Sequence, residues 1–185
     1  MDNCLKIYLP SVIKRSGFGS SDIFFIEVRY FDLCKVLFFL KNFSGCQYKI
    51  LTDLTAIDYI FSLDIIKGLN GRFCLIYNLL SISRKVRLLV KVFIHDFFFS
   101  VTAIFKSAGW LEREVWDMFG IFFLGHLELR RILTDYGFSG HPLRKDFPLS
   151  GFLEVHYSEG KKRVIYEPLE LIQEYRDFKF NCIWV

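Results

Sequence analysis

The chain is 185 residues long, which suits one domain with an extension, and 52% of its residues are hydrophobic, 22 phenylalanines among them. We expect more apolar surface than its own core can cover, as in an obligate subunit of a larger assembly. The net charge of +4 is spread along the sequence and the longest basic run is residues 161–163, so nucleic-acid binding is not expected.

The apolar segments are too short or too charged to cross a membrane. A spanning helix needs about 20 consecutive apolar residues. The most apolar window, residues 86–105, contains Arg87, Lys91, His95 and Asp96. We therefore expect the hydrophobic residues in a core and in buried contacts, with no inserted segment.

The cysteines and the N-terminus bear on the cellular compartment. Residues 1–15 lack the apolar centre of a secretory signal, and Asp2 is unusual in a transit peptide, so we expect an organellar protein of this sequence to be made inside the organelle. An odd number of irregularly spaced cysteines favours free thiols in a reducing compartment. They are Cys4, Cys34, Cys46, Cys74 and Cys182.

The N-terminal half begins with a strand signal and a helix signal. Residues 23–30 are rich in β-branched and aromatic side chains, which predicts a strand. Apolar residues at helical spacing predict a helix over 31–43, ended by Ser44 and Gly45. The apolar positions of that helix are Leu33, Val36, Leu37 and Leu40.

A hairpin is expected next. Residues 48–51 form a short apolar run, and residues 52–58 have the composition of a turn. Two strands over 59–66 and 72–80 then flank Asn70-Gly71, a strong hairpin signal.

Residues 86–94 complete the expected sheet. Their apolar side chains alternate with residues such as Arg87 and Lys91, which predicts a strand with one buried face. We expect residues 20–94 to form an antiparallel or mixed sheet with a packed helix. The predicted class is α+β, with an irregular segment and an extended C-terminal tail after the sheet.

Residues 109–148 are dense in charged, aromatic and glycine residues. Within them, residues 110–119 have helical spacing, with Glu112 and Glu114 expected in the first turn. Gly109 is expected to precede this helix and Gly120 to end it. The chain beyond it predicts irregular backbone held by specific side chains.

We expect one domain over residues 1–148 and a tail over 149–185 that docks on a partner. The tail has too few periodic apolar positions for a core of its own. Within it, residues 154–167 predict a hairpin and 169–175 a short helix.

The charges of residues 109–148 nearly cancel, five basic against six acidic, which indicates paired charges at an interface core. Arg113 and Asp117 are four residues apart, which suits an ion pair within the helix. Further basic residues are expected to clamp carboxylates of this chain or of a neighbour, bidentately in the case of the arginines; a solvated basic face is the alternative. They are Arg130, Arg131, Arg144 and Lys145.

Enzymatic chemistry has little support in the sequence. Glu112 and Glu114 are two apart on a helix and point to different sides. Ser139 lacks the strand and helix that flank a nucleophile elbow, and the sequence has no glycine-rich phosphate-binding motif.

Metal binding is not expected either, because the histidines and cysteines do not lie at the spacing of structural zinc or iron-sulfur sites. His126 and His141 each follow a glycine, and we expect their rings to form hydrogen bonds at a crowded backbone crossing. The other histidines are His95 and His156.

These motifs resemble one known family, the 30 kDa subunit of respiratory complex I, the proton-pumping NADH:ubiquinone oxidoreductase. The run EREVWDMFGIFFLGHLELRRILTDYGFSGHPLRKDFPL carries the resemblance, and LTDLTAIDY, RVIYEPLEL and FKFN extend it to most of the chain. Residues 109–148 are called the signature segment below. The residues to which the resemblance and the charge pattern give interface or structural roles are Trp110, Glu112, Arg113, Glu114, Trp116, Asp117, Phe119, Gly120, His126, Arg130, Arg131, His141, Pro142, Arg144, Lys145 and Asp146.

The resemblance implies an architectural subunit of the peripheral arm, in the quinone module, with no active site of its own. It implies that this chain binds no cofactor, and that FMN, the iron-sulfur clusters and ubiquinone belong to partner subunits. The expected partners are the 49 kDa quinone-site subunit and adjacent iron-sulfur subunits. The expected place is the matrix side of the mitochondrial inner membrane, attached through the complex, or alternatively the cytoplasmic face of a bacterial plasma membrane.

Two other functions remain open from sequence. One is an accessory subunit of a related membrane-bound hydrogenase, which would have the same fold beside nickel-site proteins. The other is an unrelated small-molecule binding domain, which predicts a stable, monodisperse monomer.

Overall fold

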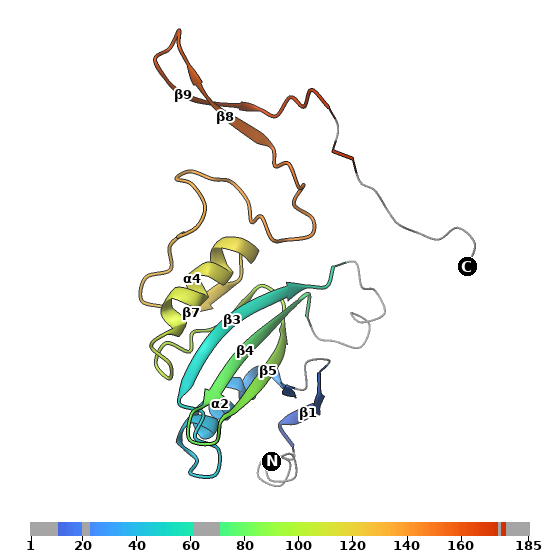
Figure 1. The fold of residues 1–185 in the computed structure, drawn as a ribbon, viewed down its shortest axis with the longest axis vertical. Coiled ribbons are helices and arrows are strands. Elements are labelled where there is room, and N and C mark those ends of the chain that lie inside the picture. The colour runs from blue at the N-terminus through green and yellow to red at the C-terminus, as the bar shows by residue number, and fades with distance from the viewer. Residues whose placement is uncertain (1–10, 20–22, 61–70, 174, 177–185) are drawn as a thin grey trace, which may run out of the picture. The chain divides into compact units, whose positions relative to one another are not determined.

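The computed structural model describes residues 11–19, 23–60, 71–173 and 175–176 (Figure 1). They belong to two compact units, Met1–Lys145 and Asp146–Val185. The described elements of the first unit are β1 (Ile13–Phe18), β2 (Phe24–Val28), the 3-10 helix η1 (Tyr30–Asp32), α2 (Leu33–Asn42), β3 (Ile50–Asp58), β4 (Phe73–Ser81), β5 (Val86–Ile94), β6 (Phe97–Phe99), α4 (Ala108–Phe119) and β7 (Phe122–Leu124).

The main sheet of the first unit is mixed, with strand order β1-β2-β5-β4-β3. Strand β2 pairs parallel with β5, and the other neighbouring strands pair antiparallel. The α+β prediction is therefore confirmed, and the sheet is of the mixed type. Strand β1 was not expected from the sequence.

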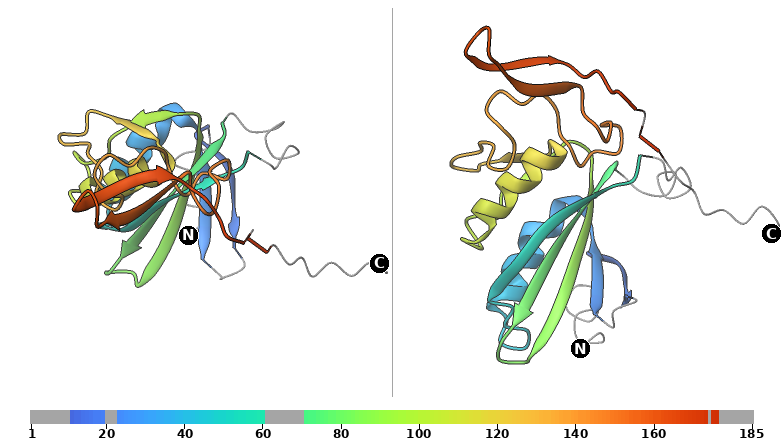
Figure 2. Two further views of the ribbon diagram at one scale, coloured as in Figure 1. Left: turned by 90° about the horizontal axis from the view of Figure 1, so that it is seen from above. Right: turned by 45° about the horizontal axis from the view of Figure 1, so that its top comes forward.

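One face of this sheet and the helices α2 and α4 enclose the core (Figure 2). Alternate residues of β5 are fully buried from Leu88 to Ile94, as the period-two pattern predicts. The four apolar positions predicted for α2 are also buried, so its helical pattern is confirmed. Burial of a side chain of this kind contributes about 1.5–3 kcal/mol, which makes apolar area the main stabilising term of the sheet.

The prediction of a turn over residues 52–58 is wrong, because these residues form most of β3. The register shifts between Leu51 and Asp53, so the apolar residues on either side of the irregularity still face the core but no longer alternate in sequence. The strand that pairs with β4 is β3 rather than residues 59–66. Residues 61–70, with Asn70 of the predicted turn, lie outside the described residues.

Helix α4 begins earlier than predicted. It starts at Ala108, so Gly109 lies inside its first turn and Glu112 is not part of that turn. Its end agrees with the prediction, because Gly120 takes a left-handed conformation with φ +73°.

The second unit contains a hairpin of β8 (Leu153–Ser158) and β9 (Arg163–Pro168), which confirms the predicted hairpin. The short helix predicted over 169–175 is wrong for residues 169–173 and 175, which are irregular. In the described part of the chain, no helix has the length and apolarity needed to span a membrane.

Candidate functional site

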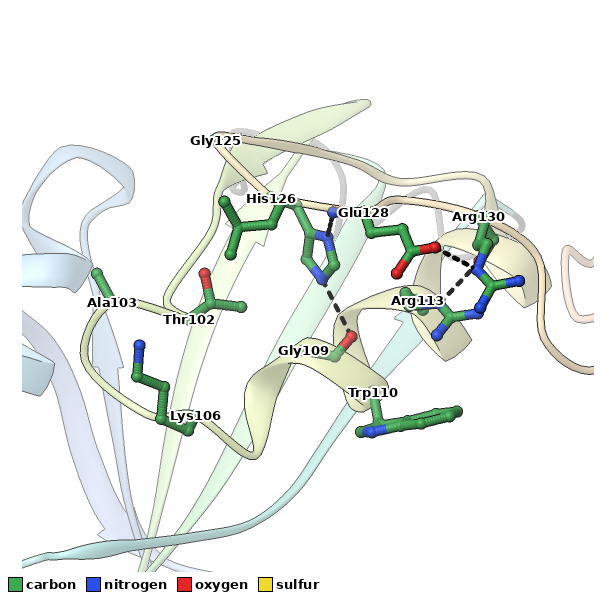
Figure 3. A pocket seen from close by; sticks show the side chains of 11 residues that line it. Thr102, Ala103, Lys106, Gly109, Trp110, Arg113, Gly125, His126, Glu128 and Arg130 are labelled. Atoms are coloured by element: carbon green, nitrogen blue, oxygen red, sulfur yellow. Dashed lines mark hydrogen bonds and ion pairs between the residues drawn. The ribbon is translucent and has the colours of Figure 1, made fainter.

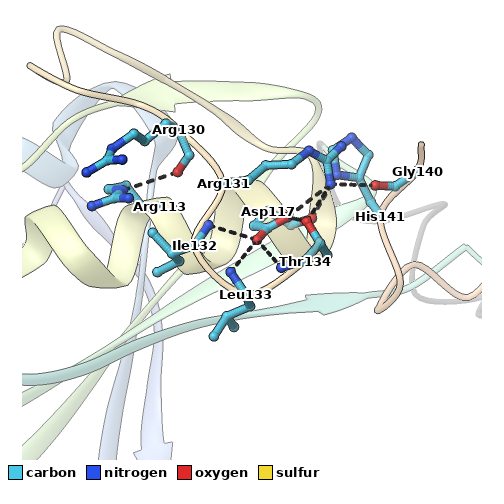
Figure 4. A network of polar contacts seen from close by, with 9 residues as sticks. All are labelled: Arg113, Asp117, Arg130, Arg131, Ile132, Leu133, Thr134, Gly140 and His141. Atoms are coloured by element: carbon cyan, nitrogen blue, oxygen red, sulfur yellow. Dashed lines mark hydrogen bonds and ion pairs between the residues drawn. The ribbon is translucent and has the colours of Figure 1, made fainter. Parts of the chain in front are cut away.

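Asp117 on α4 organises the polar part of the signature segment (Figure 4). Its buried carboxylate accepts hydrogen bonds from the backbone N–H groups of residues 132–134, at 3.1, 2.8 and 3.0 Å. It also accepts one from the Thr134 hydroxyl at 2.7 Å and pairs with Arg131 Nη1 at 3.0 Å. One side chain thus fixes a loop that has no helix or strand of its own.

Burial by itself would raise the pKa of the Asp117 carboxyl. The hydrogen bonds from Thr134, Leu133 and Ile132 outweigh burial and lower the pKa to about 2. Asp117 is therefore ionised at neutral pH, and its charge is matched by donors of its own chain.

The predicted ion pair between Arg113 and Asp117 is wrong. Asp117 pairs with Arg131 instead, which confirms that Arg131 clamps a carboxylate but through one nitrogen rather than bidentately. Arg131 Nη1 also donates to the Gly140 carbonyl oxygen at 3.0 Å. Arg113 instead donates through Nε to the Arg130 carbonyl oxygen at 3.1 Å.

Residues 141–144 satisfy the carbonyl groups at the end of α4, which have no partner within the helix. His141 Nδ1 donates to the Asp117 carbonyl at 2.9 Å, and Leu143 N–H donates to that of Met118 at 3.0 Å. Arg144 donates to the carbonyls of Phe119 and Gly120. A cation at this place also stabilises the negative end of the helix dipole.

The expectation that Arg144 grips a carboxylate is therefore corrected: its described acceptors are backbone carbonyls, and its guanidinium lies 5.6 Å from the ring centroid of Phe73. The ring hydrogen bond expected of His141 is confirmed. Burial lowers the pKa of His141, which favours the neutral ring. A Cβ at Gly120 would lie 2.6 Å from the His141 ring, so this glycine is required for space as well as for its positive φ.

Glu112 and His126 hold the other end of α4. The fully buried Glu112 accepts hydrogen bonds from Val101 N–H at 2.7 Å and from the Ser100 hydroxyl at 2.6 Å. His126 Nδ1 accepts from the Glu128 N–H, so Nε2 carries the proton and donates to the Gly109 carbonyl at 3.0 Å. The ring hydrogen bond expected of His126 is thus confirmed.

Burial raises the pKa of Glu112, although its hydrogen bonds from Ser100 and Val101 oppose the rise. The carboxylate faces into the core, and His126 Nε2 lies 4.0 Å from its Oε2. This arrangement positions the turn at residues 100–102 against the helix.

Asp58, at the end of β3, is a structural residue that the sequence analysis missed. Its buried carboxylate binds Arg72 through both oxygens, at 2.9 and 2.6 Å. It also accepts the Lys145 N–H at 3.1 Å, so it joins the sheet to the signature segment. Burial would raise its pKa, but the hydrogen bonds from Arg72, Lys145 and Ile60 lower it. The sequence gives no sign of this ion pair, because Asp58 and Arg72 are 14 residues apart along the chain.

The remaining predicted residues do not form one site. Glu114 is exposed, Trp116 and Pro142 are half-buried, and Phe119 belongs to the core. Arg130 forms an exposed ion pair with Glu128 at 2.8 Å, while the described contact of Lys145 is through its backbone. Asp146 begins the second unit.

The hairpin of the second unit gathers Glu154, His156 and Glu167, whose ligand atoms lie within 4.8 Å of one another. Strand pairing brings them together, because Glu154 faces Glu167 in the register. Spacing along the sequence does not reveal such cross-strand neighbours, so the spacing of the histidines and cysteines does not exclude a metal ligand set here. Exposed acidic groups of this kind are common without a metal, so the cluster does not by itself define a metal site.

A pocket of about 530 Å³ lies beside the first turns of α4 (Figure 3). Trp110 forms one wall, with 68% of its surface exposed, and the Arg113 guanidinium lies 4.9 Å from its ring centroid. Lys106, His126 and Arg130 are among the other lining residues.

The first unit is therefore an α+β domain with a mixed sheet, in which buried polar side chains hold the irregular part of the signature segment. The family model for the respiratory-chain NADH dehydrogenase 30 kDa subunit matches residues 26–153. The chain belongs to this family, and the resemblance found in the signature segment is confirmed.

Named relatives agree with this family. The chain is 44% identical over 177 residues to NADH-ubiquinone oxidoreductase subunit 9 of Reclinomonas americana, covering 95% of this chain and 83% of that protein. It is 47% identical over 161 residues to an NADH-quinone oxidoreductase subunit of Paramagnetospirillum magneticum, covering 86% and 77%. A trypsin-resistant fragment of Nqo5 has the same fold, with a TM-score of 0.57 at 22% identity, over 69% of this chain and 98% of that one.

Proposed function

We propose that this chain is a structural and assembly subunit of the peripheral arm of a proton-pumping NADH:ubiquinone oxidoreductase, without an active site of its own. The match of the family model to residues 26–153 carries the proposal. Electron transfer from NADH to ubiquinone would occur in neighbouring subunits, and this chain would hold them in place.

The hydrogen-bond partners of the polar side chains support an architectural role. Four of these side chains bind backbone groups or neighbouring side chains of the same chain: Asp117, Glu112, His126 and His141. A catalytic acid or base needs an accessible partner and a pKa near the working pH, whereas Asp117, the most connected of these groups, has its pKa held at about 2. These groups are suited to fixing a loop.

Exposed apolar side chains support an obligate partner. The paired strands β6 and β7 place four of them opposite one another in the register, and each is 38–50% exposed. They are Phe97, Phe99, Phe122 and Leu124. Contiguous apolar surface of this kind is typical of protein interfaces, and we propose the 49 kDa quinone-site subunit and adjacent iron-sulfur subunits as the partners.

The proposal includes the cofactors and the location. FMN, iron-sulfur clusters and ubiquinone would be bound by partner subunits, and this chain by itself would contain no stoichiometric iron, zinc, flavin or nucleotide. It would lie on the matrix side of the mitochondrial inner membrane, or on the cytoplasmic face in a bacterium, attached through the complex.

Gentle solubilisation of native membranes tests the proposal. The chain should co-migrate with NADH-to-quinone activity in a native gel, and its deletion should remove the assembled complex. Migration with nickel-site proteins would favour the hydrogenase-type alternative. A monodisperse free monomer, present in the same membranes without the activity band, would favour a small-molecule binding domain.

A further inference from the structure

Arg113 is a buried cation without a counter-charge in the described part of the chain. Only 7% of the residue is exposed. Its Nε donates to the Arg130 carbonyl, and among the described residues neither terminal nitrogen has a hydrogen-bond acceptor and no carboxylate lies within ion-pair distance. The terminal nitrogens keep some solvent-accessible surface, so they are free to bind a carboxylate that displaces water from them.

The pocket beside α4 gives that anion a way to reach Arg113, which lines it (Figure 3). Lys106, Arg113 and Arg130 bring three positive charges to the lining, and Glu128 brings one negative charge, which pairs with Arg130. Lys106 also has no carboxylate within ion-pair distance among the described residues. The pocket is therefore complementary to negative charge.

The rim of the pocket also carries two exposed apolar side chains. Trp110 is 68% exposed and Leu127 is 96% exposed, and both line the opening. Trp and Arg are the residues on which interface energy concentrates, and here they lie in one stacked pair. A small free anion would bind the cations but would leave these apolar side chains in water, whereas a protein segment covers both.

We propose that this pocket receives a Glu or Asp side chain of a neighbouring subunit, whose carboxylate pairs with Arg113 while adjacent apolar residues of the same segment cover Trp110 and Leu127. This inference rests on the proposed function, because it takes the neighbour to be another subunit of the same complex. The planar guanidinium of Arg113 would donate hydrogen bonds to this carboxylate, and Lys106 adds a second cation at the rim of the pocket.

Carbodiimide cross-linking of the assembled complex tests the pairing, because the reagent joins an amine to a carboxylate in direct contact. The variant Arg113→Lys places an amine in the pocket. We expect mass spectrometry to find position 113 linked to an Asp or Glu of another subunit. The variant Arg130→Lys is the control, and we expect it to be linked to Glu128 of the same chain.

The outcomes separate this inference from the proposed function. If the chain is in the complex but position 113 is linked only to its own chain, or to nothing while the control is linked, the pocket proposal is wrong and the proposed function remains. If the wild-type chain does not co-migrate with the complex, the proposed function itself fails.

A second pair of variants measures the effect on assembly. Arg113→Met keeps much of the side-chain length and removes the charge, and Arg130→Met does the same at the exposed rim. We expect the amount of assembled complex to fall roughly tenfold for Arg113→Met and by less than about twofold for Arg130→Met. Equal effects of the two variants would contradict a special role of Arg113.

Discussion

The main sheet and the signature segment are stabilised in different ways. The sheet buries apolar side chains along four of its strands, β2 to β5, so its stability is spread over many residues of similar kind. The described part of the signature segment beyond α4 has little regular structure and depends on a few buried polar atoms, above all the carboxylate of Asp117. The sheet should therefore tolerate changes that conserve volume, and the segment should not.

The largest effect is expected for Asp117. Removing its carboxylate leaves three backbone N–H groups without their acceptor and Arg131 without its counter-charge, so Asp117→Ala should lower the free energy of unfolding by about 3–5 kcal/mol. Asp117→Asn should also be costly although it has nearly the same shape. Urea unfolding of the chain in mild detergent, followed by tryptophan fluorescence, measures both.

The matched variant in the sheet is Leu88→Met, because Leu88 is fully buried and the exchange nearly conserves volume. It should cost less than about 1.5 kcal/mol. If Leu88→Met were as destabilising as Asp117→Asn, the contrast between the two regions would not hold.

The next largest effect is expected at Gly120. An alanine there would adopt an unfavourable positive φ and would also meet the ring of His141 and the guanidinium of Arg144. Gly120→Ala should cost about 2–4 kcal/mol, of which roughly 1–2 kcal/mol comes from the backbone.

Gly137→Ala separates these two terms, because Gly137 has φ +75° and no atom of the described residues lies within 4 Å of the place that a Cβ would take. It should show the backbone cost alone, about 1–2 kcal/mol, in the same unfolding measurement. Equal losses at the two glycines would mean that residues 141–144 yield to the extra methyl group.

Acid should weaken the signature segment through Asp117. Its pKa is about 2 in the folded chain and 3.8 without the fold, so its contribution is fully present above about pH 5 and is lost as the pH falls toward 2. The difference corresponds to roughly 2 kcal/mol. Unfolding measured from pH 5 to pH 2 should show a shallower fall for Asp117→Asn; a slope equal to that of the wild type would contradict this assignment. The lowered pKa of Asp58 leaves a remaining slope in both.

The smallest effect is expected for Arg144→Lys. Lysine keeps the charge near the end of α4 but loses the fork that serves the Phe119 and Gly120 carbonyls, at a cost of about 1 kcal/mol. In the complex, Arg144→Ala should reduce the amount assembled, with Arg144→Lys intermediate and turnover per flavin nearly unchanged. Normal assembly without turnover would instead place Arg144 in the chemistry.

The regular elements could be predicted because their side chains repeat. Helix α2 and strand β5 follow apolar periods that the sequence displays directly, and β2 and β4 were indicated by their strand-forming composition and the neighbouring hairpin signal. Strand β3 was missed because the irregularity between Leu51 and Asp53 interrupts its period. A period carries no information about such a shift in register.

The polar contacts could be predicted only in part. The sequence indicated that His126, His141 and Arg131 have structural partners, and they do. The prediction for Arg144 named a carboxylate as its partner, because the sequence cannot show which backbone carbonyl, a group present at every residue, a side chain will bind. The pair of Asp58 with Arg72 was not predicted, because the two residues are far apart in the sequence although they are in contact in the structure.

The parallel pairing of β2 with β5 also determines when the sheet can be completed during synthesis. Phe24 pairs with Leu88, so β2 leaves the ribosome well before its central neighbour exists. Strands β3, β4 and β5 join through antiparallel neighbours and can associate as each one emerges. Strand β1 can pair with one edge of β2 at once, but the other edge of β2 must wait for β5, and this is the interval in which a chaperone has the most to protect.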